Sequence, residues 1–206
     1  DSSPTENIVH ALWTKDYEPG SSKEVEELNT LLESFLKTAN QKVNDFYEVP
    51  DFEGNELVKS SIENEIKNDL SSALKICSLL HDKTEFNRIL ELIEHNEKVR
   101  LFNAVEMLEL VLPKKIAKEL NSLFDFTLDP NLSRKTYVKP DVHSFFNKIV
   151  HTEEAAFSPW TKAVCIYSSW KNNQRSFIQG LKKETGKKEH YIVKETKNFV
   201  IHAIEP

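Results

Sequence analysis

The sequence predicts an all-α protein, a right-handed helix-pair superhelix (α-solenoid) of about eight to nine helices. Apolar side chains recur every three or four residues in several segments, the period of an amphipathic helix. The chain has only 4 glycines and 8 prolines, and alternating β-branched or aromatic residues are nearly absent, which disfavours a sheet with tight turns. Three of the expected helices begin with similar residues, and two of these starts have the spacing expected of stacked helix pairs.

The clearest helical pattern lies in residues 97–113, EKVRLFNAVEMLELVLP. Its apolar residues are expected on one buried stripe: Leu101, Ala104, Val105, Leu108, Val111 and Leu112. Pro113 ends the pattern, because the residue before a proline is pushed out of the α region, whereas proline suits the first turn of a new helix. One helix should therefore end here and another begin.

The other helices are expected from the same periodicity and from start and stop signals. They span residues 4–15, 23–48, 56–80, 83–94, 113–126, 141–151, 158–171, 174–184 and 189–204. In the first of them Ile8 and Leu12 should point inward, with Val9 as a further candidate. Asp82 and Glu85 have the spacing of a capping box, and Ser158 followed by Pro159 has the pattern of an N-cap with proline at the first helical position.

Linkers rich in proline, glycine and polar residues divide this array. The expected parts are an N-terminal helical segment at residues 1–54, which contains the long helix 23–48, central helices at 55–129 and C-terminal helix pairs at 141–206, all in one continuous solenoid domain. Residues 127–141 are polar and contain two prolines, and they should form the irregular loop between the last two parts.

Composition narrows the classes of function. With 39% hydrophobic and 29% charged residues, the chain has the profile of a soluble globular protein. Its net charge of −6, from 27 basic and 33 acidic residues, argues against a surface built to bind phosphates, so no nucleic-acid partner is expected. Cys77 and Cys165 fall within apolar helical patterns and are expected to be buried thiols.

Membrane insertion by this chain is not expected. No apolar run approaches the roughly 18 residues that a membrane span needs, and the N-terminal segment lacks the apolar core of a signal peptide. Because the first residue is Asp1, we expect a fragment of a longer protein. Its expected location is the cytoplasm or the cytoplasmic face of a membrane protein.

Three of the expected helices begin alike, with a hydrophobic residue or threonine, then a cation, then small and apolar residues. The cations are Arg100, Lys162 and Lys194, and the last two copies lie 32 residues apart in register, a period typical of helix-pair repeats. A cation in the first turn opposes the helix dipole. We therefore expect these side chains to reach a neighbouring repeat, the alternative being solvated lysines on an ordinary bundle.

The segment 97–113, and more weakly SPWTKAVCIYSSWK and HYIVKETKNFVIHAI, resembles the HEAT-repeat family, whose second helix typically starts with a Val-Arg pair followed by alanines and a leucine. Residues 62–124 are similar to the soluble HEAT-containing segment of bacterial transporters related to the ATP/ADP translocases and the major facilitator group. Asn103, Ala104, Glu106 and Leu108 match that group's motif, but Glu109 stands where an aspartate is expected. The resemblance implies a module attached to a transporter.

Residues with recognisable catalytic chemistry were not found in the sequence, so no catalytic residue, cofactor or metal site is predicted. The 7 histidines include no His-Glu-x-x-His motif and no pair at helical ligand spacing. Glycine-rich phosphate loops and the Gly-x-Ser-x-Gly elbow are also missing. Trp170 is expected in the core, whereas Trp160, at a helix start, is equally consistent with core and with binding.

These observations favour a non-catalytic protein-interaction or scaffolding module, whose partner is another protein or an attached transporter domain. The candidate binding residues are Arg100, Asn103, Trp160, Lys162 and Lys194. One alternative is a DNA binder or DNA glycosylase-type enzyme on a HEAT-like scaffold, with a basic patch of Arg134, Lys135, Lys139 and Lys171. The other is a small-molecule-binding helical bundle, which would need a large apolar cavity.

Overall fold

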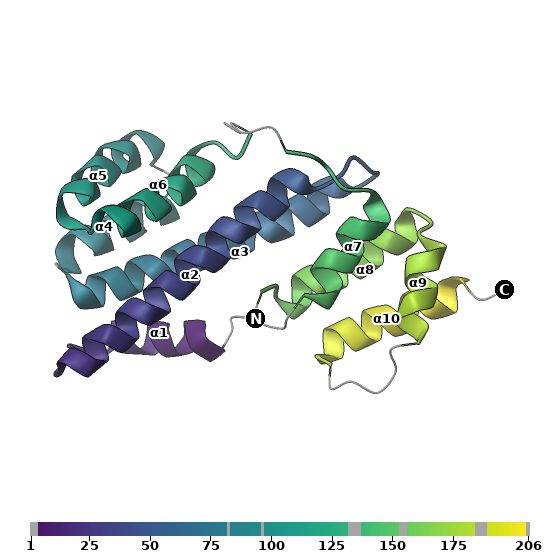
Figure 1. The fold of residues 1–206 in the computed structure, drawn as a ribbon, viewed down its shortest axis with the longest axis horizontal. Coiled ribbons are helices and arrows are strands. Elements are labelled where there is room, and N and C mark those ends of the chain that lie inside the picture. The colour runs from purple at the N-terminus through teal and green to yellow at the C-terminus, as the bar shows by residue number, and fades with distance from the viewer. Residues whose placement is uncertain are drawn as a thin grey trace. The chain divides into compact units, whose positions relative to one another are not determined.

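The computed structural model describes residues 4–81, 83–95, 97–131, 137–152, 156–183 and 189–204 (Figure 1). Every regular element in these residues is a helix, which confirms the all-α prediction. The described helices number ten, slightly more than the overall count of eight to nine, and they correspond to the ten segments expected from periodicity. They are α1 (Pro4–Thr14), α2 (Ser22–Glu48), α3 (Asn55–Leu80), α4 (Lys83–Glu94), α5 (Lys98–Val111), α6 (Lys114–Leu128), α7 (Val142–His151), α8 (Pro159–Lys171), α9 (Arg175–Lys182) and α10 (Tyr191–Ile204).

Two compact units make up the chain, and each combines separate stretches of sequence. The α4–α6 unit comprises Ser2–Val43 and Ile66–Lys135, and the α7–α10 unit comprises Asn44–Glu65 and Thr136–Pro206. Both α2 and α3 therefore contribute residues to each unit. Among the described residues, no helix combines the length and the apolar character that crossing a membrane requires.

In the α4–α6 unit, α5 packs against both α4 and α6 (Figure 1). Polar contacts link further helices of this unit. The buried ammonium of Lys42 on α2 lies 2.8 Å from the carboxylate of Asp69 on α3. The indole N–H of Trp13 on α1 donates to Asn87 Oδ1 on α4 at 3.0 Å. Lys42 and Trp13 thus each have a polar partner on another helix, which offsets the cost of removing their polar groups from water.

The stripe expected on α5 is narrower in the structure. Leu101, Leu108 and Leu112 are buried and Val105 is half-buried, but Val111 is 54% exposed. The Ala104 side chain lies outside the described residues. The boundary at Pro113 is confirmed: Leu112 has extended backbone geometry, and α6 begins at the residue after the proline.

Two further expectations concern the buried residues of α1 and the capping box before α4. On α1 the buried residue is Val9, whereas Ile8, expected to point inward, is 59% exposed. The capping box predicted for Asp82 lies outside the described residues. The neighbouring Lys83 forms an ion pair with Asp16.

The α7–α10 unit contains two helix pairs in contact. Besides the neighbours α7 with α8, α8 with α9 and α9 with α10, the first helices of the pairs, α7 and α9, contact each other, as do the second helices, α8 and α10 (Figure 1). The first residues of α8 and α10, Pro159 and Tyr191, are 32 residues apart. The spacing noted in the sequence therefore matches the start of two helices that pack side by side.

The start of α8 is fixed by local and tertiary hydrogen bonds. As predicted, Ser158 is the N-cap: its Oγ accepts a hydrogen bond from the Thr161 backbone N–H at 3.2 Å, and Pro159 occupies the first turn. The carboxylate of Glu65 on α3, itself buried, accepts hydrogen bonds from the Ser158 N–H at 2.9 Å, the Ser158 hydroxyl at 2.6 Å and the Thr161 hydroxyl. Ser61 on α3 adds a 2.6 Å contact to the same threonine.

Both cysteines are buried free thiols, as the sequence predicted. Burial raises the pKa of Cys77 on α3 to about 12. Burial, together with the nearby negative charge of Glu65, raises the pKa of Cys165 on α8 as well. Because the thiolate is the reactive form, both residues should be inert in the folded protein at neutral pH.

Replacing Glu65 by alanine should lower the free energy of unfolding by about 3 kcal/mol, because three donors at the start of α8 lose a buried charged acceptor. Urea denaturation followed by circular dichroism would measure the change. The matched control is Glu56→Ala, an exposed carboxylate in the first turn of the same helix, which should change stability by less than about 1 kcal/mol because it loses only its interaction with the helix dipole. Equal effects of the two variants would contradict the role given to Glu65.

The two thiols should not react with Ellman's reagent in the native protein at neutral pH, since their raised pKa values and burial disfavour the thiolate. In urea both should react rapidly. Absorbance of the thiolate released from the reagent gives the number of reactive cysteines. Rapid labelling of either cysteine without denaturant would show that solvent reaches its side chain in the folded protein.

Candidate functional site

A shallow groove of about 450 Å³ runs between α8 and α10 in the α7–α10 unit. We call it the α8/α10 groove. Its lining residues are Trp160, Ala163, Val164 and Tyr167 from α8, and Ile192, Glu195, Thr196 and Phe199 from α10. Most of these side chains are apolar or aromatic, so the groove offers a surface for hydrophobic contact.

The two helices contribute to the groove with the same spacing. From each helix the lining positions follow the pattern i, i+3, i+4, i+7, which places them on one helix face. Each α8 position has an α10 counterpart 32 residues later, from Trp160 and Ile192 at the start to Tyr167 and Phe199 at the end. The groove is therefore a feature of the repeat, in which equivalent faces of two second helices meet.

Burial separates the floor of the groove from its walls. Ala163 and Val164 form the floor and are each 5% exposed. Trp160 and Phe199 are 55% and 52% exposed, although burying such large side chains would normally stabilise the fold. Exposed aromatic residues on both walls of one groove are typical of a binding surface.

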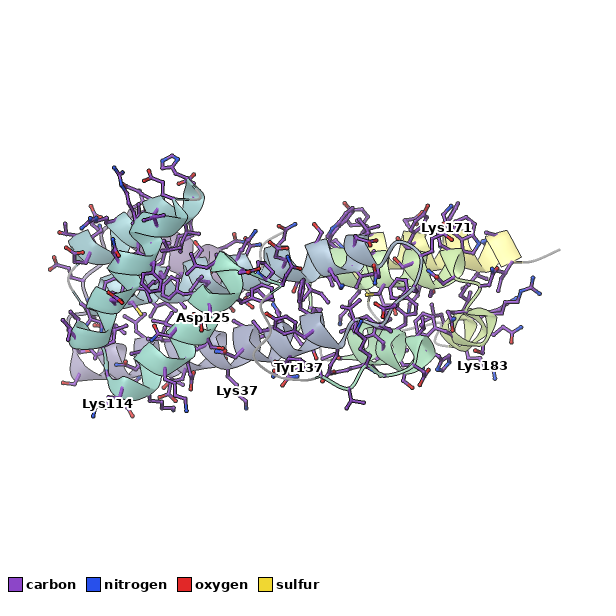
Figure 2. All side chains as sticks on the ribbon, turned by 90° about the horizontal axis from the view of Figure 1, so that it is seen from above. Lys37, Lys114, Asp125, Tyr137, Lys171 and Lys183 are labelled. Carbon is purple, nitrogen blue, oxygen red and sulfur yellow. The ribbon has the colours of Figure 1, made fainter. Side chains whose placement is uncertain are left out.

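An aromatic cluster lies at the end of the groove near the carboxyl terminus of α8. The ring of Trp170 lies 5.6 Å from that of Tyr167 and meets Phe199 edge-on at 5.3 Å. The ammonium of Lys171, labelled in Figure 2, lies over the Trp170 ring at 4.9 Å and over the Tyr167 ring at 5.8 Å. These cation–π contacts hold the positive charge at this end of the groove.

The predicted binding residues are distributed over both units. Trp160 lines the groove. Lys162 reaches beyond its own helix, donating to the carbonyl oxygen of Thr152, which follows α7, at 2.7 Å. Lys194 is exposed and does not line the groove, although it lies in α10.

The other two candidates, Arg100 and Asn103, lie on α5 in the α4–α6 unit, and both are exposed. The guanidinium of Arg100 pairs at 2.9 Å with Glu97, the residue before its own helix. It thus finds a local carboxylate one turn away, rather than reaching to a neighbouring repeat as expected.

Sequence reasoning missed three residues of the α7–α10 unit. Tyr167 and Phe199 were not predicted as binding residues, although their helical spacing from Trp160 and Ile192 signals a shared face. Lys197 is the buried cation of α10, and it donates to Glu189 at 2.6 Å. Lys197 follows Val193 by four residues and precedes Val200 by three, so helical spacing places it on the buried stripe of α10, a signal that its exposed neighbour Lys194 lacks.

The alternative functions find little geometric support in the described residues. The proposed basic patch includes Lys139, which pairs with Asp51 at 2.8 Å, and Lys171 at the aromatic cluster, while Arg134 and Lys135 lie outside the described residues. In the part of the chain that the structure describes, no three histidine, cysteine or acidic side chains gather closely enough to hold a metal ion.

Comparison with protein-family models, curated proteins and solved structures found no match to this chain.

The wall and the floor of the groove should respond differently to truncation. Trp160→Ala should change the free energy of unfolding by less than about 1 kcal/mol, because that side chain is mostly in solvent. Val164→Ala should cost about 2 kcal/mol, because it removes packed methyl groups from a buried position. Urea denaturation measures both, and a larger loss for Trp160→Ala would place that side chain in the core.

Proposed function

We propose that this chain is a non-catalytic protein-interaction module, a HEAT-like array of helix pairs that binds a partner through the α8/α10 groove. The observation that carries the proposal is the exposure of large aromatic side chains on both walls of one groove. Such surfaces release ordered water when an apolar partner covers them, which favours association.

The packing of α7 to α10 supports the helix-pair part of this proposal. In repeat arrays each helix contacts the equivalent helix of the next pair, and both α7 with α9 and α8 with α10 have that relation. Equivalent helices then present equivalent faces, and repeat proteins use such extended faces to bind partners. The partner is a separate protein or another domain of a longer polypeptide, such as the attached transporter domain that the sequence resemblance implies.

Charge and groove composition support a protein as the partner. The chain carries a net charge of −6, whereas binding to nucleic acid depends on clustered cations. The groove is also an open surface, unlike the enclosed cavities that bury most of a small-molecule ligand. A hydrophobic segment of another protein fits these properties best.

The test is affinity capture from cell extract with the whole chain as bait, in wild-type form and with Trp160→Ala combined with Phe199→Ala. The double variant should capture at least about tenfold less of a specific partner, because hot-spot contacts usually come from a few aromatic residues. Quantitative mass spectrometry compares the captured proteins.

The matched control is Phe102→Ala on α5, an aromatic residue that is 56% exposed and lies in the α4–α6 unit. This variant should capture the same partner as the wild type. If the groove variant and the wild type capture the same proteins in the same amounts, the groove is not the binding surface.

A further inference from the structure

Two charged residues of opposite sign lie along the α8/α10 groove. Glu195 is part of the lining on α10, and Lys171 lies on the lining face of α8, one turn beyond Tyr167. Both side chains are exposed. The groove therefore has a carboxylate and an ammonium that a bound partner segment can meet.

These charges lie towards opposite ends of the groove. α8 and α10 run in the same direction, since their first-turn residues Trp160 and Ile192 share the groove and Trp170, near the end of α8, packs on Phe199. Glu195 is the repeat equivalent of Ala163, so it lies near the amino ends, and Lys171 lies eight residues after that position. Eight helical residues span roughly 12 Å, a little more than two turns.

Resting on the proposed function, we propose that the occupant of the groove is an amphipathic helix of a partner protein that carries a basic residue near one end of its apolar stripe and an acidic residue near the other. The partner's basic side chain pairs with Glu195, and its acidic side chain pairs with Lys171. Charge complementarity identifies this occupant, since a segment with the same charge at both ends would place one like pair together.

The shape of the groove explains why the segment is a helix. Its lining on α8 extends from Trp160 to Tyr167, roughly 10 Å or about two helical turns, and Lys171 lies one turn beyond. An apolar stripe at i, i+3, i+4 and i+7 on the partner would lie along the matching stripes of α8 and α10, the usual mode of helix-in-groove recognition. Contact with two aromatic rings already orients Lys171, so its charge is held in place before binding.

The experiment measures binding of a synthetic probe to the purified whole chain by fluorescence anisotropy. The probe is a labelled helical peptide of about 14 residues, roughly four turns, with leucines at i, i+3, i+4 and i+7 and one lysine and one glutamate at opposite ends of that stripe. In the control peptide both charged residues are glutamine. The expected result is tighter binding of the charged peptide.

Charge reversals in the protein then test the pairing. Lys171→Glu and Glu195→Lys should each weaken the charged peptide about fivefold, because each places like charges together at an exposed site. The double variant should bind within about twofold of the wild type, because the peptide can bind with its ends exchanged. The glutamine peptide should bind all four proteins alike, and circular dichroism checks that each is folded.

Three results would overturn this inference: no binding of either peptide, equal binding of both, or single reversals without effect. Each leaves the proposed function standing if Trp160→Ala combined with Phe199→Ala still removes the captured partner. Conversely, if the groove double variant captures as much partner as the wild type, the proposed function itself is wrong. The two failures are thus distinguishable.

Discussion

The buried carboxylate of Glu65 is the interaction on which the α7–α10 unit depends most. It accepts hydrogen bonds from both the backbone and the hydroxyl of Ser158 and from the hydroxyl of Thr161, so it fixes the first turn of α8 against α3. A buried negative charge is tolerated only where donors surround it, and here one backbone N–H and two hydroxyl groups at the start of α8 supply them. The direction in which α8 leaves that turn then positions the wall of the groove.

Repetition accounts for the rest of the candidate site. Because equivalent residues of α8 and α10 are 32 positions apart and the helices pack side by side, one face pattern appears twice and produces a groove between the copies. Neither helix alone would form it. Small buried residues such as Ala163 let the two backbones approach, while the larger neighbours Trp160 and Phe199 remain at the rim.

The sequence could predict the features that depend on local chemistry. Helical periodicity, the break at Pro113, the Ser158 cap and the buried thiols follow from spacing and backbone preference, and the structure confirms them. Features that depend on distant partners could not be predicted. The role of Glu65 is decided by Ser158 and Thr161, which lie more than 90 residues further along the chain, so local pattern carried no signal for it. Linkers likewise divide the sequence into contiguous parts, whereas both compact units are discontinuous.

That discontinuity limits how the protein can be divided. Residues 44–65 belong to one unit, yet they lie between two stretches of the other, and they include the ends of two long helices. A stretch of gene that encodes residues up to 135 therefore carries residues 44–65 without the rest of their unit, and a stretch that begins at residue 136 encodes that unit without them, so recombination at this point would divide one body between two proteins.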